Sequence, residues 1–130
     1  MLPQQGYPQM LEFSASTEFD GIQDEVQMLG FSETDDGDGA YILIQWQNSY
    51  DQQDIDLKQN TPHIEVCEQG YSQYGGLERI SVEGKKIIFD FVSGTCIGDA
   101  FGRVSVCLNR NPKDFIGSLS RAFGADIFAV

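Results

Sequence analysis

Few residues in this chain have the chemistry that catalysis needs. His63 is the single histidine, and it directly follows Pro62 at the start of a predicted strand. A general base must reach a substrate proton, and a nucleophile such as a cysteine thiolate needs a base beside it. Nothing in the sequence identifies such a base for Cys67, Cys96 or Cys107. We therefore expect no catalytic residue, and the alternative is an enzyme or small-molecule-binding domain centred on His63.

A cluster of acidic residues raises the question of a calcium site. Residues 36–39 read Asp-Gly-Asp-Gly, which resembles the opening of an EF-hand loop. However, Ala40 stands where a third oxygen ligand belongs, and Gln47 stands where a bidentate Glu is required. The flanking segments also have the composition of strands. We predict a solvated turn here, with no metal and no other cofactor.

The cysteines and the first residues suggest a compartment. Three cysteines are an odd number, and no pair has the CxxC spacing of a zinc or redox motif. This usage is typical of a reducing cytoplasm, and we expect Cys67 and Cys107 to be small buried side chains. The sequence shows no signal-peptide pattern and no apolar stretch of membrane-spanning length. We therefore expect a cytoplasmic protein.

The net charge of −12 is concentrated in one part of the chain. Residues 1–57 contain twelve Asp or Glu and no Lys or Arg, whereas the remaining residues contain eight of each sign. A field of one sign repels nucleic acid and anionic membranes and accelerates encounter with a basic protein. We predict a basic protein partner, with no nucleic-acid or membrane partner. Two alternatives are that the acids only maintain solubility, or that they form an acidic nucleic-acid mimic.

Residues 50–76 form a polar segment that is rich in Gln, Asp and Tyr. A long loop of this kind inside a small domain is uncommon without a function, because its backbone groups must find partners. Tyrosines beside acids and amides are typical of protein-recognition surfaces, where a rigid ring supplies contact area. The segment is therefore either a recognition surface or an ordinary exposed loop.

Hydrophobic periodicity predicts a mainly β fold. The predicted strands are residues 11–19, 25–32, 41–46, 63–67, 77–82, 85–92 and 103–108. A helix begins after the N-cap residue Asn111, with Pro112 in its first turn, and its apolar stripe includes Phe115 and Leu119 before Gly124 ends it. The predicted fold is mainly β (α+β): an antiparallel sheet of about six to seven strands with one C-terminal helix packed on a face. Residues 1–130 are predicted to form a single domain, of which 1–9 are a flexible lead.

The polar segment and the hairpin after it resemble a known family. The resemblance is carried by Asp51, Gln52, Gln53, Asp54 and Leu57, by His63, Ile64, Glu65, Glu68 and Gln69, and by Tyr74, Gly75, Gly76, Leu77 and Glu78. Over residues 41–92 the sequence resembles the immunity protein 10 family of bacterial polymorphic toxin systems. The resemblance implies a cytoplasmic, non-enzymatic, mainly β protein that binds a cognate toxin domain and blocks it.

The resemblance and the polar segment together point to a set of toxin-binding residues. They are Gln52, Gln53, Asp54, Glu65, Glu68, Gln69, Tyr71 and Tyr74. The sequence also allows a homo-oligomer, and it does not identify the toxin.

Overall fold

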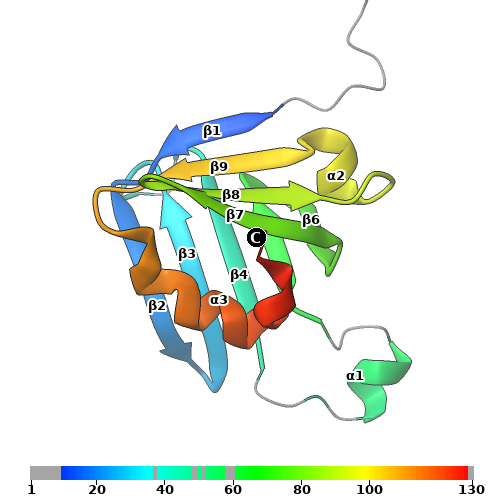
Figure 1. Ribbon diagram of the computed structural model, residues 1–130. Coiled ribbons are helices and arrows are strands. Elements are labelled where there is room, and N and C mark those ends of the chain that lie inside the picture. The colour runs from blue at the N-terminus through cyan, green and yellow to red at the C-terminus, as the bar shows by residue number, and fades with distance from the viewer. Residues whose placement is uncertain (1–9, 37, 48–49, 51, 58–60, 129–130) are drawn as a thin grey trace, which may run out of the picture.

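A computed structural model describes residues 10–36, 38–47, 50, 52–57 and 61–128, apart from the side chains of Asp54 and Gln69. The predicted flexible lead lies outside these residues. Nine strands of the described chain form two sheets (Figure 1). The five-stranded sheet contains, in spatial order, β2 (Thr17–Gln23), β3 (Val26–Ser32), β4 (Tyr41–Trp46), β5 (His63–Val66) and β6 (Glu68–Tyr74). The four-stranded sheet contains β1 (Leu11–Ser14), β9 (Arg103–Cys107), β8 (Lys86–Phe91) and β7 (Leu77–Glu83).

Short helices connect and cover the sheets. They are α1 (Gln52–Asp56), α2 (Cys96–Ala100), α3 (Ile116–Phe123) and the 3-10 turns η1 (Pro112–Phe115) and η2 (Ala125–Ile127). The mainly β fold with a C-terminal helix is thereby confirmed. The strands number more than the six or seven expected because β6 was not predicted, and because the segment predicted as one strand, residues 11–19, is divided.

Residues 11–19 contribute to both sheets. Strand β1 pairs with β9 in parallel, whereas β2 pairs with β3 in the other sheet. The amide of Ala15 donates to the carbonyl of Cys107 at 2.9 Å, and the next amide, of Ser16, donates to the carbonyl of Ser32 at 2.8 Å. The chain therefore crosses from one sheet to the other between two adjacent residues.

The hairpins explain why the remaining strands pair as they do. Strands β7 and β8 form the predicted hairpin, and Gly84 in its turn has a φ of 61°, which favours glycine. Strands β3 and β4 form the predicted hairpin across the acidic turn. The β2–β3 hairpin turns instead at Asp24 and Glu25, whose φ values are 51° and 68°. The two hairpins of the five-stranded sheet thus place acidic turns at opposite ends of β3.

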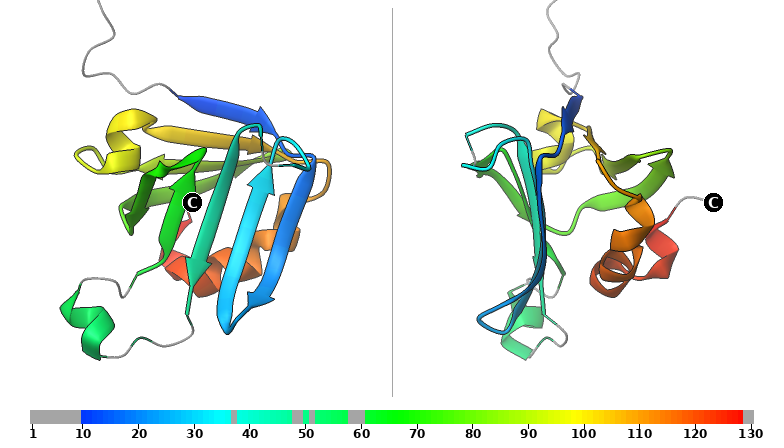
Figure 2. Two further views of the ribbon diagram at one scale, coloured as in Figure 1. Left: turned by 180° about the vertical axis from the view of Figure 1, so that it is seen from behind. Right: turned by 90° about the vertical axis from the view of Figure 1, so that its left-hand side faces the viewer.

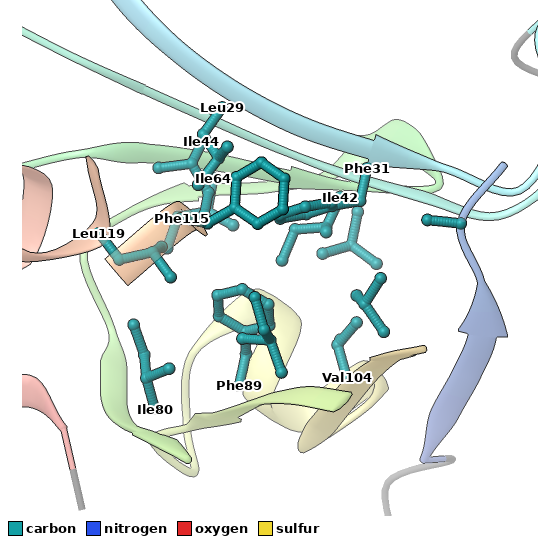
Figure 3. Close-up of a cluster of buried hydrophobic side chains, with 14 of the residues drawn as sticks. Leu29, Phe31, Ile42, Ile44, Ile64, Ile80, Phe89, Val104, Phe115 and Leu119 are labelled. Atoms are coloured by element: carbon teal, nitrogen blue, oxygen red, sulfur yellow. The ribbon is translucent and has the colours of Figure 1, made fainter. Parts of the chain in front are cut away.

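The C-terminal helix has the predicted ends. The side chain of Asn111 accepts from the amide of Lys113 at 3.0 Å, which caps η1 and leads into α3. Gly124 ends α3 with a φ of 88°. Phe115 and Leu119 are buried and point at the five-stranded sheet, where the Phe115 ring meets Phe31 edge-on at 5.0 Å (Figure 3). The helix therefore covers part of a sheet face, as expected.

One cluster of buried side chains joins both sheets and α3. Its members include Leu29, Phe31, Ile42, Ile44 and Ile64 of the five-stranded sheet, and Ile80, Phe89 and Val104 of the four-stranded sheet (Figure 3). The edge-on view in Figure 2 shows the four-stranded sheet and α3 on the same side of the five-stranded sheet. We call that side the inner face and the opposite side the outer face of the five-stranded sheet.

The polar segment is more ordered than predicted. Residues 63–66 form β5, as predicted, but residues 68–74 form β6 where a loop was expected. Helix α1 lies in the connection from β4 to β5, away from both sheets (Figure 1). Cys67, between β5 and β6, and Cys107, in β9, are half-buried and are both free thiols. The expectation that these cysteines are small buried side chains is therefore met only in part: Cys67 packs against the core cluster, but it lies in a turn with a φ of 66°.

Candidate functional site

Two of the predicted binding residues lie on the outer face of the five-stranded sheet. His63 of β5 pairs with Tyr74 of β6, and Glu65 pairs with Ser72, so these side chains share one face. Gln45 of β4 pairs with His63, which extends the same row across a third strand. The face therefore presents aromatic, amide and carboxylate groups from three neighbouring strands.

Tyr41 fixes the carboxylate of Glu65. The Tyr41 hydroxyl donates a hydrogen bond to Glu65. Burial raises the pKa of Tyr41 well above its usual value, and the bond to Glu65 and the charges of Glu65 and Glu68 raise it further. Tyr41 therefore stays protonated at neutral pH and holds the Glu65 carboxylate as an acceptor facing solvent. Because the charge of Glu68 acts on the Tyr41 hydroxyl, the exposed Glu68 side chain also lies near that hydroxyl.

His63 and Tyr74 border a hollow of about 350 Å³. Their ring centroids are 4.9 Å apart, with the planes tilted by 59°. Gln45, Tyr50 and Thr61 also line the hollow. Among the described residues, no carboxylate lines this hollow. The described lining therefore gives no support to the alternative centred on His63.

Tyr71 lies on the opposite side of β6 from Tyr74. Its ring packs edge-on against Phe101 at 5.2 Å, next to α2. The neighbouring Gln73 accepts from the amide of Ile97 at 2.6 Å, which attaches α2 to β6. Tyr71 is nevertheless partly exposed, with 36% of its surface accessible. The structure thus separates Tyr71 from the outer face that carries Glu65 and Tyr74.

The remaining predicted residues are divided between two elements. Gln52 and Gln53 are exposed on α1, and the Gln52 amide donates to Asp56 at 2.9 Å. Asp54 is in α1 and Gln69 is in β6, but their side chains lie outside the described structure. The predicted set therefore maps to the outer face, the α2 side of β6 and the α1 connection.

The acids of the first half do not form one continuous face. Glu12 pairs with Lys86 in the four-stranded sheet at 3.2 Å. Glu18, on the inner face of β2, lies 3.8 Å from Arg110, and Asp20 accepts from the Ser118 hydroxyl of α3 at 2.7 Å. A nucleic-acid mimic requires its acids side by side, so the described residues do not meet the condition for that alternative.

The acidic turn between β3 and β4 uses its side chains to hold itself together. Asp36 accepts from the Thr34 hydroxyl at 2.8 Å and from the amide of Asp38 at 3.0 Å. Both bonds lower the pKa of Asp36 below its usual value, and the bond from the Asp38 amide contributes more than the bond from Thr34. The amide of Ala40 similarly donates to Glu33 at 3.1 Å. The turn is therefore a hydrogen-bonded hairpin connection that carries negative charge.

Tyr41 and His63 were not among the predicted binding residues. A signal for Tyr41 was present in the alternation of Tyr41, Leu43 and Gln45 with Ile42, Ile44 and Trp46. That alternation assigns Tyr41 to a solvent face, but only the pairing of β4 with β5 places it beside Glu65.

Comparison with known proteins identifies the family. The model of the family described as Immunity protein 10 matches residues 12–96, well over half of the chain. The match includes both β2 and β3, which lie upstream of the segment that carried the resemblance. No curated protein and no solved structure matches the chain. Within the described residues, none of the helices has the length and apolar character needed to cross a membrane. The chain belongs to the immunity protein 10 family.

Proposed function

We propose that the protein binds a cognate bacterial toxin domain in the cytoplasm and neutralises it by protein–protein contact, without catalysis. The observation that carries this proposal is the family match over residues 12–96. The charge of the chain supports a basic toxin, because a strongly acidic protein captures a basic partner quickly. Fast capture suits a protein that must act before a toxin damages its own cell.

The contact surface centres on the outer face of the five-stranded sheet. Glu65 and Tyr74 share that face, and Glu68 lies close to Tyr41 beside it. An aromatic ring supplies contact area at low entropic cost, and the two acids supply directed charge. Further contacts come from α1 and from the α2 side of β6. These contacts involve Gln52, Gln53, Asp54, Gln69 and Tyr71.

Co-expression with the toxin domain encoded by the neighbouring gene tests this function. The toxin domain alone should stop growth, and co-expression of the full-length chain should restore it. The two proteins should also co-purify as a stable complex. Rescue of growth without any complex would point to a catalytic or indirect mechanism, and absence of rescue would refute the proposal.

Charge reversal tests the contact residues separately. The double variant Glu65→Lys, Glu68→Lys should weaken the complex by about 100-fold, since like charges in an interface cost several kcal/mol. The matched control is Glu78→Lys, Glu83→Lys, which changes two acids of β7 in the other sheet. Circular dichroism verifies that each variant is folded. A complex as tight as wild type with the first variant would contradict these contact residues.

A further inference from the structure

The outer face has a second hollow, over β2, β3 and β4. It has a volume of about 350 Å³, and its lining includes Phe19, Gly30 and Leu43. These three residues form one cross-strand row, because Phe19 pairs with Gly30 and Gly30 pairs with Leu43. The Phe19 side chain remains exposed, with 45% of its surface accessible. The hollow thus has apolar walls and a glycine as its floor.

The backbone requires a glycine neither at Gly30, which lines this hollow, nor at Gly21 of β2, which lies outside its lining. Gly21 and Gly30 lie inside strands, and neither has a positive φ. A Cβ at Gly30 would meet Leu43 Cδ1 at 3.3 Å, and one at Gly21 would meet the Phe19 ring at 3.4 Å. Glycine within a strand weakens it by about 1 kcal/mol and is often found where another molecule approaches closely. The missing side chain at Gly30 therefore keeps the hollow open at a cost to the fold.

Acidic groups lie at one rim of the same hollow. Asp35 and Asp36 of the β3–β4 turn line it, together with Tyr41. The side chains of Ser16 and Thr17 donate to the Asp35 carboxylate, and hydrogen bonds to Asp36 lower the pKa of that carboxyl below its usual value. Within the described structure, no ion pair involves these two acids. Their charge is therefore available to a cationic group from outside.

The five strands of the sheet that forms this face carry no Lys or Arg, and Lys58 lies outside the described structure. Residues 1–57 contain no Lys or Arg, and residues 61–76 also contain none. In the described chain, the bases that form ion pairs do so with Glu12, Glu18, Asp90 and Asp114, none of which is on the outer face. The edge-on view of Figure 2 shows the four-stranded sheet and α3 on the inner side, away from this face.

We infer that this hollow receives an arginine or lysine side chain from the toxin domain. The side chain's methylenes contact Phe19 and Leu43, and its charged end reaches Asp35 and Asp36. This inference rests on the proposed immunity function and extends the contact surface from β4–β6 to β2. A second copy of this chain is a poorer occupant, because two molecules with a net charge of −12 repel each other.

Two substitutions test the hollow without removing a core contact. Gly30→Val fills it, and because valine favours strands the fold should be at least as stable. Asp35→Asn removes the charge while its carbonyl oxygen still accepts from Thr17. The matched controls are Ser81→Val and Glu78→Gln, both on β7 of the other sheet. The probe is the toxin domain encoded by the neighbouring gene, inactivated by substitution in its own active site, and calorimetry measures Kd.

We expect Gly30→Val and Asp35→Asn each to weaken Kd by about tenfold or more, because one well-placed interface contact is worth at least that factor. Both controls should stay within about twofold of wild type. Raising the salt concentration should weaken the wild type more than Asp35→Asn, since the variant lacks one of the screened charges.

The outcomes separate this inference from the immunity function. If wild type binds the toxin domain and both hollow variants bind it equally well, the inference about the hollow is refuted and the immunity function still stands. Wild type that does not bind at all would overturn both. Sedimentation velocity adds a third outcome: a wild-type dimer that Gly30→Val dissociates, with toxin binding unchanged, would make this face a homo-oligomer interface and overturn the inference.

Discussion

Under the proposed function, Tyr41 of the outer face has both a structural role and a role in presenting Glu65 to the toxin. Its hydroxyl donates to the Glu65 carboxylate, and its ring borders the hollow above β2 to β4. The same bond that fixes Glu65 for a partner also ties β4 to β5 through their side chains. Stability and the direction in which Glu65 points therefore depend on the same proton.

The Tyr41→Phe variant removes the hydroxyl group that donates to Glu65 and keeps the aromatic ring. At pH 7 the free energy of unfolding should fall by about 1 kcal/mol, the usual net value of one hydrogen bond. The pKa of Tyr41 is raised in the folded state, so its contribution is fully present below pH about 10 and is lost as the pH rises further. Urea titrations at pH 8 and at pH 10.5 should show a smaller alkaline loss for Tyr41→Phe than for wild type. An equal loss in both proteins would show that another group governs the alkaline range.

Strand alternation predicts the orientation of some side chains on this face and not others. The alternation in residues 41–46 and 63–66 correctly separates Glu65 from the buried Ile64 and Val66. Between β5 and β6 the register shifts, and Cys67 has a positive φ. This irregularity reverses the alternation, so Tyr74 faces outward while Tyr71 packs toward α2. A glycine at position 67 would have indicated this positive φ, but the residue there is a cysteine, so the sequence does not predict the reversal.

At the scale of elements, α2 depends on the absence of a single side chain. Gly98 is buried, and a Cβ there would lie 1.9 Å from the carbonyl oxygen of Val92. The helix is held at this distance because Thr95 caps it and Gln73 of β6 accepts from its Ile97 amide. The backbone of the preceding turn therefore occupies the space that any larger residue would need.

Gly98→Ala should lower the free energy of unfolding by about 3 kcal/mol, since a clash with backbone cannot be relieved by a rotamer change. The matched variant is Gly117→Ala in α3, where the glycine is exposed and the nearest atom to a Cβ is the Arg121 guanidinium at 3.5 Å. That variant should raise stability by about 0.5–1 kcal/mol through helix propensity. Urea denaturation of both variants measures the difference. Equal effects would show that α2 can shift away from Val92 at little cost.

Elements with a local signal were predictable, and those defined by tertiary pairing were not. The cap at Asn111 and the stop at Gly124 are local, so the C-terminal helix was predicted with its ends. Residues 11–19 divide into two strands because the adjacent amides of Ala15 and Ser16 donate to different sheets. The alternation of apolar and polar residues does not predict such a change of sheet. Strand β6 was missed because Gly70 and its polar neighbours have low strand propensity, and its pairing with β5 overrides that preference.

At the scale of the whole molecule, the two charge signs are separated. The outer face and the turns of the five-stranded sheet are acidic, whereas the described bases belong to the four-stranded sheet and the C-terminal segment. Four of these bases, Arg79, Lys86, Arg103 and Arg110, form ion pairs. Asp90 of β8 lies 2.7 Å from Arg103 and 3.4 Å from Arg79, and the bond to Asp90 raises the pKa of Arg103. Pairing on one side thus leaves the negative field of the other side uncompensated, which is the property that capture of a basic toxin requires.

The shared core predicts that both sheets and α3 unfold together, as expected of a single domain. Leu119 is fully buried where α3 meets the cluster that contains residues of both sheets. Leu119→Ala should lower the free energy of unfolding by about 2–5 kcal/mol, because it removes buried contacts and leaves a cavity. Trp46 is the single tryptophan and is buried in β4, so its fluorescence reports on the five-stranded sheet. Far-UV circular dichroism reports on the whole fold.

In a urea titration of Leu119→Ala, the fluorescence and dichroism midpoints should fall together, with an unchanged slope. Val92→Ala is the matched control, since Val92 lies outside the strands with 42% of its surface exposed, and it should change stability by less than about 0.5 kcal/mol. A dichroism midpoint that falls while the Trp46 midpoint stays at its wild-type value would mean that the five-stranded sheet is stable without α3. The outer face would then stay folded without the other sheet and α3. Destabilising substitutions in the four-stranded sheet could not in that case weaken toxin binding by unfolding this face.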